Sequence, residues 1–132
     1  MDKQEMFNRA WTGLKNQNWE PSVGEGGCKY NSGNGVRCAW GHVDAENASL
    51  LHRYEGYSVD GLHDHGIGLA SELSRDDLRF AMSLQRCHDI VAENDTDVIY
   101  LYSIEKDSVN IGRDMEANFR ALAKLYGLTI PE

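Results

Sequence analysis

The most ligand-like local motif in the sequence is His63-Asp64-His65, which lies in a glycine-rich segment. Two imidazoles that flank one residue can point at the same metal ion, and zinc accepts imidazole and thiolate ligands in a tetrahedral arrangement. The side chains that could complete such a site are Cys28, Cys38, His42 and His52. No Cys-x-x-Cys or His-Glu-x-x-His spacing supports the site, so we predict no resident metal or cofactor. A small metal-dependent enzyme or zinc-stabilised module centred on His63 and His65 is kept as the alternative function.

A second group, Cys87-His88-Asp89, has the residue types of a nucleophilic site. Neighbouring residues on a helix diverge by about 100°, so this thiol and this imidazole cannot form a catalytic pair with each other. We therefore predict that Cys87 is buried and that His88 is bonded to a backbone carbonyl. The glycines of the chain match neither a phosphate-binding loop nor a dinucleotide fingerprint. No residue is predicted to be catalytic.

The other two cysteines lie in a segment with the pattern of a β-hairpin. Residues 28–30 and 36–40 alternate in the two-residue period of strands with one buried face, and residues 31–35 are rich in glycine and asparagine. A turn centred on Gly33 would place Cys28 opposite Cys38, whereas a two-residue turn at Asn34-Gly35 would not. We prefer the first register. Both thiols then pack as small hydrophobic groups.

Three longer helices are expected to surround this hairpin. Helix signals span residues 3–17, residues 75–93 after the capping Ser74, and residues 113–126 before the glycine at Gly127. The first of these helices carries an apolar stripe of Phe7, Ala10, Trp11 and Leu14. The pattern predicts an α+β fold, with three main helices packed around a small antiparallel sheet built on the hairpin, in a single globular domain over residues 1–132.

The remaining segments give weaker signals. Asp44 is expected to cap a short helix that reaches Arg53, and residues 57–68 are expected to form a loop, with one helical turn after Ser58. Residues 98–104 are β-branched and aromatic, which favours a strand, although a short helix fits nearly as well. Trp19 lies in the segment that ends the first helix and could serve either as a core residue or as a ligand platform.

The charge of the chain limits its partners. The 132 residues carry a formal charge of −8, and the acidic residues concentrate in residues 43–77 and 86–118. The electrostatic field of this negative charge repels the phosphate backbone of DNA and RNA, so direct nucleic-acid binding is disfavoured. The sequence has no apolar run long enough to span a membrane and no apolar signal-peptide core. Its three cysteines are an odd number, which argues against a complete set of disulfides. These features predict a cytoplasmic protein with reduced thiols.

An aromatic segment near the end of the chain is the predicted partner-binding surface. Tyr100 and Tyr102 alternate with aliphatic residues, and carboxylates flank them on both sides. Aromatic residues rimmed by acids suit contact with a basic partner, although a buried strand between polar turns fits at least as well. The residues assigned to this surface are Asp95, Asp97, Tyr100, Tyr102, Glu105 and Asp107.

Several of these motifs resemble a group of small, uncharacterised proteins of phage and prophage genomes. The resemblance rests on the Cys28-x-Tyr30 strand, the glycine turn with Cys38-Ala-x-Gly, and Leu84-Gln-x-x-His-Asp in a later helix. The closing Ala-Leu-Ala-Lys-Leu-Tyr-Gly-Leu is also similar, whereas Trp40 and His42 replace smaller residues and residues 95–112 look like an insertion. The resemblance implies a phage-type genomic setting and no particular activity.

Together these features predict a phage or prophage accessory protein that is not an enzyme. We expect it to bind and inhibit or modulate a host protein in the bacterial cytoplasm. The most concrete version is an inhibitor of a nucleic-acid-handling defence system, of the anti-CRISPR or anti-restriction type, which presents an acidic surface to a basic, nucleic-acid-binding partner. The oligomeric state is left open.

Overall fold

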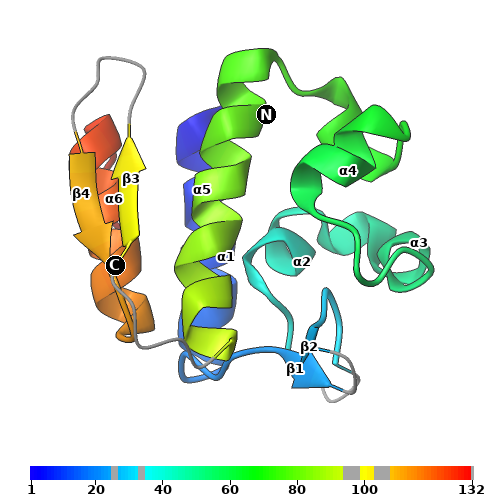
Figure 1. Cartoon of the computed structure of the whole chain (residues 1–132), viewed down its shortest axis with the longest axis horizontal. Coiled ribbons are helices and arrows are strands. Elements are labelled where there is room, and N and C mark those ends of the chain that lie inside the picture. Colours follow the sequence, from blue (N-terminus) through cyan, green and yellow to red (C-terminus); the bar gives the residue numbers. More distant parts are fainter. Residues whose placement is uncertain (25–26, 33–34, 94–98, 103–107, 132) are drawn as a thin grey trace.

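The fold is organised around three longer helices, seen in Figure 1, a computed structural model that describes residues 1–24, 27–32, 35–93, 99–102 and 108–131. Helix α5 stands at the centre, α1 lies against it, and α6 lies beside a pair of antiparallel strands. The bounds of these elements are α1 Lys3–Asn16, α5 Arg75–Ala92, β3 Ile99–Tyr102, β4 Ser108–Ile111 and α6 Met115–Tyr126. The predicted α+β class with three main helices is confirmed.

The ends of the long helices follow from local side-chain chemistry. The carboxylate of Asp2 accepts a hydrogen bond from the Glu5 N–H at the start of α1. The Ser74 hydroxyl does the same for the first turn of α5, and Gly127 ends α6 with a left-handed φ of 66°. All three helices agree with their predicted bounds to within a turn.

Aromatic residues join the first helix to the last. Phe7 and Trp11 stack in α1 with ring centroids 5.9 Å apart, and the Phe7 ring lies 6.1 Å from that of Phe119 in α6. Trp19 meets Trp11 edge-on at 4.8 Å and is partly buried against the same cluster. Its role in the described structure is therefore packing, and the apolar stripe predicted for α1 faces the core.

The hairpin predicted for residues 28–40 is wrong in register and in its second strand. Cys28 pairs with Val23 in the short strands β1 (Val23–Gly24) and β2 (Gly27–Cys28), and one isolated bridge joins Asn31 to Arg37. This bridge fits neither of the two turns considered from the sequence. The chain then enters helix α2 (Ala39–Val43).

Cys38 explains why a helix replaces the expected strand. Its extended backbone and its sulfur, which accepts a hydrogen bond from the Gly41 N–H at 3.4 Å, make it the N-cap of α2. Ala39, Trp40 and Val43 are all buried around this single helical turn. A five-residue segment in which only His42 is not buried shows no reliable period, so the alternation of apolar residues does not distinguish a strand from a helix here.

Shorter helices connect α2 to α5, as the right side of Figure 1 shows. Part of the segment expected as a loop is helical after Ser58, and residues 99–102 form the strand favoured from the sequence. The side chain of Asp44 caps no helix. It accepts hydrogen bonds from the Leu69 N–H at 3.0 Å and from the Asn47 side chain at 2.7 Å, and so links the segment of η1 to that of η2. The connecting helices are η1 Ala45–Asn47, α3 Ala48–His52, α4 Val59–Asp64 and η2 Gly68–Glu72.

Within the described ranges, no helix is both long and apolar enough to cross a membrane.

Candidate functional site

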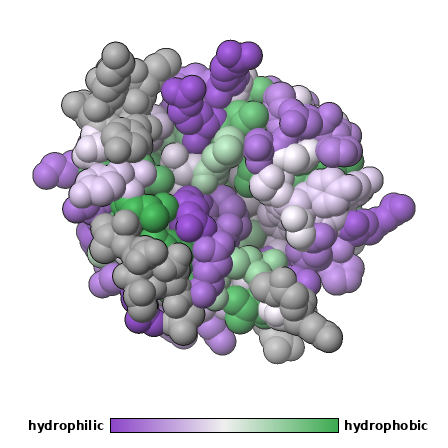
Figure 2. Space-filling model, viewed as in Figure 1, coloured by the Kyte–Doolittle hydropathy of each residue, from purple (hydrophilic) through white to green (hydrophobic). Residues whose placement is uncertain are grey.

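A groove of about 510 Å³ lies where β2, the start of α4 and one face of α5 meet. Residues 28–30 line one side and residues 56–60 line another. Helix α5 contributes Met82, Gln85, Arg86 and Asp89, and its C-cap residue contributes Glu93. Two of its lining side chains, Tyr57 and Met82, are large, apolar and exposed to 41% and 42%. In Figure 2 the face seen in this view is largely hydrophilic, and apolar residues reach it only in small patches.

Asp89 is the most firmly held carboxylate of the groove. Its Oδ1 accepts a hydrogen bond from Gln85 Nε2 at 2.8 Å and lies 2.8 Å from His88 Nδ1. Gln85 also accepts from the Trp40 N–H at 2.8 Å, so α5 is tied to α2 through the same side chain. The orientation of Asp89 is therefore set by two side chains that the core itself holds in place.

The tautomer of His88 follows from its partners. The ring is fully buried, and its Nε2 lies 2.8 Å from the Ser22 backbone nitrogen. That backbone N–H is a donor, so Nε2 must accept and the ring proton must sit on Nδ1, from which it is donated to Asp89. The prediction that His88 bonds a backbone carbonyl is wrong: the imidazole connects a backbone N–H to a carboxylate.

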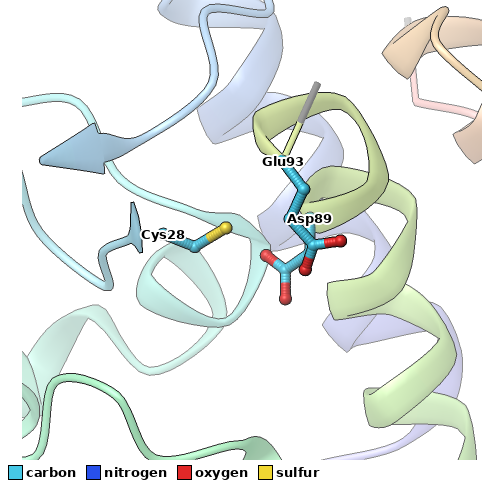
Figure 3. Close-up of side chains that lie close together, drawn as sticks. All are labelled: Cys28, Asp89 and Glu93. Carbon is cyan, nitrogen blue, oxygen red and sulfur yellow. The ribbon is translucent and has the colours of Figure 1, made fainter. Parts of the chain in front are cut away.

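Cys28 faces two carboxylates of α5, as Figure 3 shows. Its sulfur and one oxygen from each of Asp89 and Glu93 all lie within 4.8 Å of one another. Burial, reinforced by the negative charges of Asp89 and Glu93, raises the pKa of the Cys28 thiol to about 12. A thiol in this state is a poor nucleophile at neutral pH, but the three side chains offer the ligand atoms that a metal ion requires.

The groove also contains basic and aromatic groups. Arg86 Nη1 donates to both carboxylate oxygens of Glu93, at 3.0 and 2.9 Å, in an ion pair on the protein surface. The Tyr30 hydroxyl donates to the Tyr57 carbonyl, and the Tyr30 N–H donates to Glu55 at 2.7 Å. These bonds fix the wall of the groove opposite α5.

The structure separates the ligands proposed for the zinc alternative. His65 Nδ1 lies 2.9 Å from the Gly61 carbonyl, and His63 Nδ1 lies 3.5 Å from its neighbour Asp64. His42 bonds Gln17, and Cys38 caps α2. Among the residues that the structure describes, Cys28, Asp89 and Glu93 form the single group of three or more possible ligands with atoms so close together.

Cys87 is fully buried, as predicted. Its sulfur lies 3.6 Å from the Asn118 carbonyl, and the Asn118 side-chain amide donates to the Cys87 carbonyl at 3.1 Å. Burial raises the pKa of this thiol far above its usual range. The residue joins α5 to α6 and faces away from solvent.

The predicted partner-binding segment is described only in part. Tyr100 is 58% exposed in β3 and pairs with Asn110 of β4. The backbone of Tyr102 belongs to the same strand, and its side chain lies outside the described part of the chain, as do Asp95, Asp97, Glu105 and Asp107.

Sequence reasoning missed the groove because its members are far apart along the chain. The available signal was the spacing of Gln85, Asp89 and Glu93, which recur every fourth residue and so share one face of a helix. That Cys28 faces them depends on a chain reversal that no local pattern specifies.

Comparisons with protein-family models, with curated proteins and with solved structures found no match for this chain.

Proposed function

We propose that this protein is a phage or prophage accessory protein that binds a basic, nucleic-acid-binding host protein in the bacterial cytoplasm. Inhibition of a defence system of the anti-CRISPR or anti-restriction type is the specific activity proposed. The overall charge of −8 supports a basic protein partner over direct contact with DNA or RNA, because an acidic surface attracts the first and repels the second.

The groove between α4 and α5 is the surface proposed for this contact. The observation that carries the proposal is that exposed Tyr57 and Met82 line the same groove as the carboxylates of Asp60, Asp89 and Glu93. Aromatic and methionine side chains supply apolar contact area, while neighbouring carboxylates select a lysine or arginine side chain of the partner. Two basic side chains, Lys29 and Arg86, also line the groove, so the three carboxylates outnumber the cations by one. Arg86 is already engaged by Glu93, which reduces its repulsion of such a partner.

A photo-crosslinking experiment compares this groove with the segment around Tyr100. A benzoylphenylalanine residue replaces Tyr57 in one variant and Tyr100 in another, and each is irradiated in lysate of a bacterial host. We expect the variant at position 57 to capture a basic nucleic-acid-binding protein, with a yield that falls as salt is raised. The purified partner should then lose nucleic-acid binding or cleavage when this protein is added.

Two matched carboxylate variants test the role of charge. Asp60 lines the groove and Asp64 lies on the same helix outside it, with a side chain 75% exposed. Asp60→Asn should reduce crosslinking, whereas Asp64→Asn should leave it unchanged. Capture of no basic protein from either position, or equal loss in the two variants, would contradict the proposal.

A further inference from the structure

We propose that Cys28, Asp89 and Glu93 bind one divalent transition-metal ion of the zinc type at the base of the groove. Figure 3 shows the Cys28 sulfur turned toward the two carboxylates, which come from the last turn of α5 and from its C-cap residue. The donor set combines one sulfur with two oxygens and comes from elements about 60 residues apart, so it differs from a run of surface acids. The site shares Asp89 and Glu93 with the groove proposed for the protein contact, and its test needs no protein partner.

The geometry is close to that of a bound ion. Zinc binds a thiolate at about 2.3 Å and a carboxylate oxygen at about 2.0–2.2 Å, which places tetrahedral ligands about 3.5 Å from one another. The three ligand atoms already lie within 4.8 Å of one another, so small side-chain rotations can complete the site. Cys28 approaches from β2, whose backbone is fixed by its pairing with Val23.

Two buried side chains outside the ligand set support Asp89 as a metal ligand. His88 is 0% exposed and Gln85 is 9% exposed, and both direct a polar atom to Asp89 Oδ1. Hydrogen bonds of this kind orient ligands in known metal sites and hold their lone pairs toward the ion. Both bonds fall on Oδ1, so Oδ2 receives neither of them.

The surroundings predict what kind of ion would bind. A thiolate with two carboxylates favours zinc, cobalt or cadmium over magnesium or calcium, which prefer oxygen ligands alone. On binding, the Cys28 S–H bond breaks, its proton passes to the buffer, and the thiolate sulfur bonds the metal. The opposing positive charges that line the groove are Arg86 and Lys29. Arg86 is bonded to Glu93, so Glu93 must share its oxygens between the guanidinium and the ion.

The fourth coordination position would face the groove of about 510 Å³. Zinc sites with three protein ligands and one open position hold water or a substrate there, whereas purely structural zinc sites use four protein ligands. The site is therefore of the open type, with Tyr57 and Met82 in the wall of the same groove.

The test uses the full-length protein without an affinity tag. Zinc is titrated by calorimetry, and cobalt is titrated by absorbance, because a thiolate ligand gives a charge-transfer band in the near ultraviolet that oxygen and nitrogen ligands do not. We expect one ion per chain, a cobalt–thiolate band, and no binding of magnesium at the same concentration.

Variants of the ligands and of the rival histidines identify the site. Cys28→Ser should abolish the charge-transfer band, and Asp89→Asn and Glu93→Gln should each weaken zinc binding by about tenfold or more. The His63→Ala/His65→Ala double variant should bind as the wild type does. Circular dichroism confirms that each variant is folded, and Cys28→Ser is nearly isosteric.

Two results would overturn the proposal. Failure of the folded wild-type protein to bind zinc or cobalt stoichiometrically would exclude the site. Binding that persists with an unchanged band in Cys28→Ser, or that disappears in the double histidine variant, would place the metal elsewhere. Neither measurement involves a host protein, so failure here leaves the test of the proposed function unaffected.

Discussion

The contact between Gly13 and His42 allows a sharp test of the packing of α1 on α2. A β-carbon added at Gly13 would lie 2.2 Å from both Cγ and Nδ1 of the imidazole. That ring cannot swing away freely, because its Nε2 bonds Gln17 Oε1 at 2.7 Å, and Gln17 also accepts from the Arg37 N–H at 3.1 Å. Gly13→Ala therefore forces either the helices apart or the hydrogen-bond network open.

The sign of the effect depends on two opposing terms. Alanine is favoured over glycine in a helix interior by about 1 kcal/mol. Overpacking a close contact costs typically 1–3 kcal/mol, and a separation of 2.2 Å belongs at the upper end of that range. We expect Gly13→Ala to lower the free energy of unfolding by about 1–2 kcal/mol, despite its better helix propensity.

A double-mutant cycle isolates the contact. In a His42→Ala background the obstruction is gone, so Gly13→Ala should become stabilising by up to about 1 kcal/mol, which gives a coupling energy of about 2–3 kcal/mol. Urea unfolding followed by circular dichroism measures all four proteins, and Thr12→Ala on the exposed face of α1 calibrates helix propensity. If Gly13→Ala stabilises both backgrounds equally, the steric reasoning fails.

Three further predictions concern stability and use the same unfolding measurement. Burial, with the nearby charge of Arg37, lowers the pKa of His42 from 6.5 to about 4, so the unfolded chain binds a proton that the native state does not. Stability should therefore fall as the pH drops from 6.5 to 4, by about 1–2 kcal/mol after allowance for solvent screening, and a flat profile between these values would contradict the assignment. Asp44→Ala removes a buried carboxylate that accepts hydrogen bonds from Leu69 and Asn47, and it should lower the free energy of unfolding by about 1–3 kcal/mol. An unchanged urea midpoint would show that these two bonds do not stabilise the fold. Gly127→Ala, at a φ of 66°, should cost about 1 kcal/mol, and a neutral result would exclude the left-handed cap.

The long helices could be predicted from the sequence because their signals are local. Ser74 caps α5 and Gly127 ends α6, and an apolar stripe repeats over several turns between such residues. The segment from Cys38 to Val43 could not be assigned in this way. It is a single turn of helix in which every residue except His42 is buried. Its N-cap is a cysteine, a residue type that sequence rules do not count among helix caps.

The candidate site could be predicted only in its helical half. The spacing of Gln85, Asp89 and Glu93 places them on one face of a helix, and α5 contacts α1, α2, α4 and α6 in the structure. The partner of that face is Cys28, whose position depends on its pairing with Val23. Two-residue strands carry too little pattern to reveal such a pairing in advance.

The aromatic contact between Phe7 and Phe119 has a consequence for synthesis of the protein in the cell. Helix α1 emerges from the ribosome early, but its apolar face is completed only by α6, roughly 110 residues later. At translation rates of about 5–20 residues per second, the apolar face of α1 stays exposed for about 5–20 seconds before α6 can cover it. Packing of α1 should therefore be completed only after α6 has emerged, and until then the aromatic face of α1 is a target for chaperones that bind exposed aromatic segments.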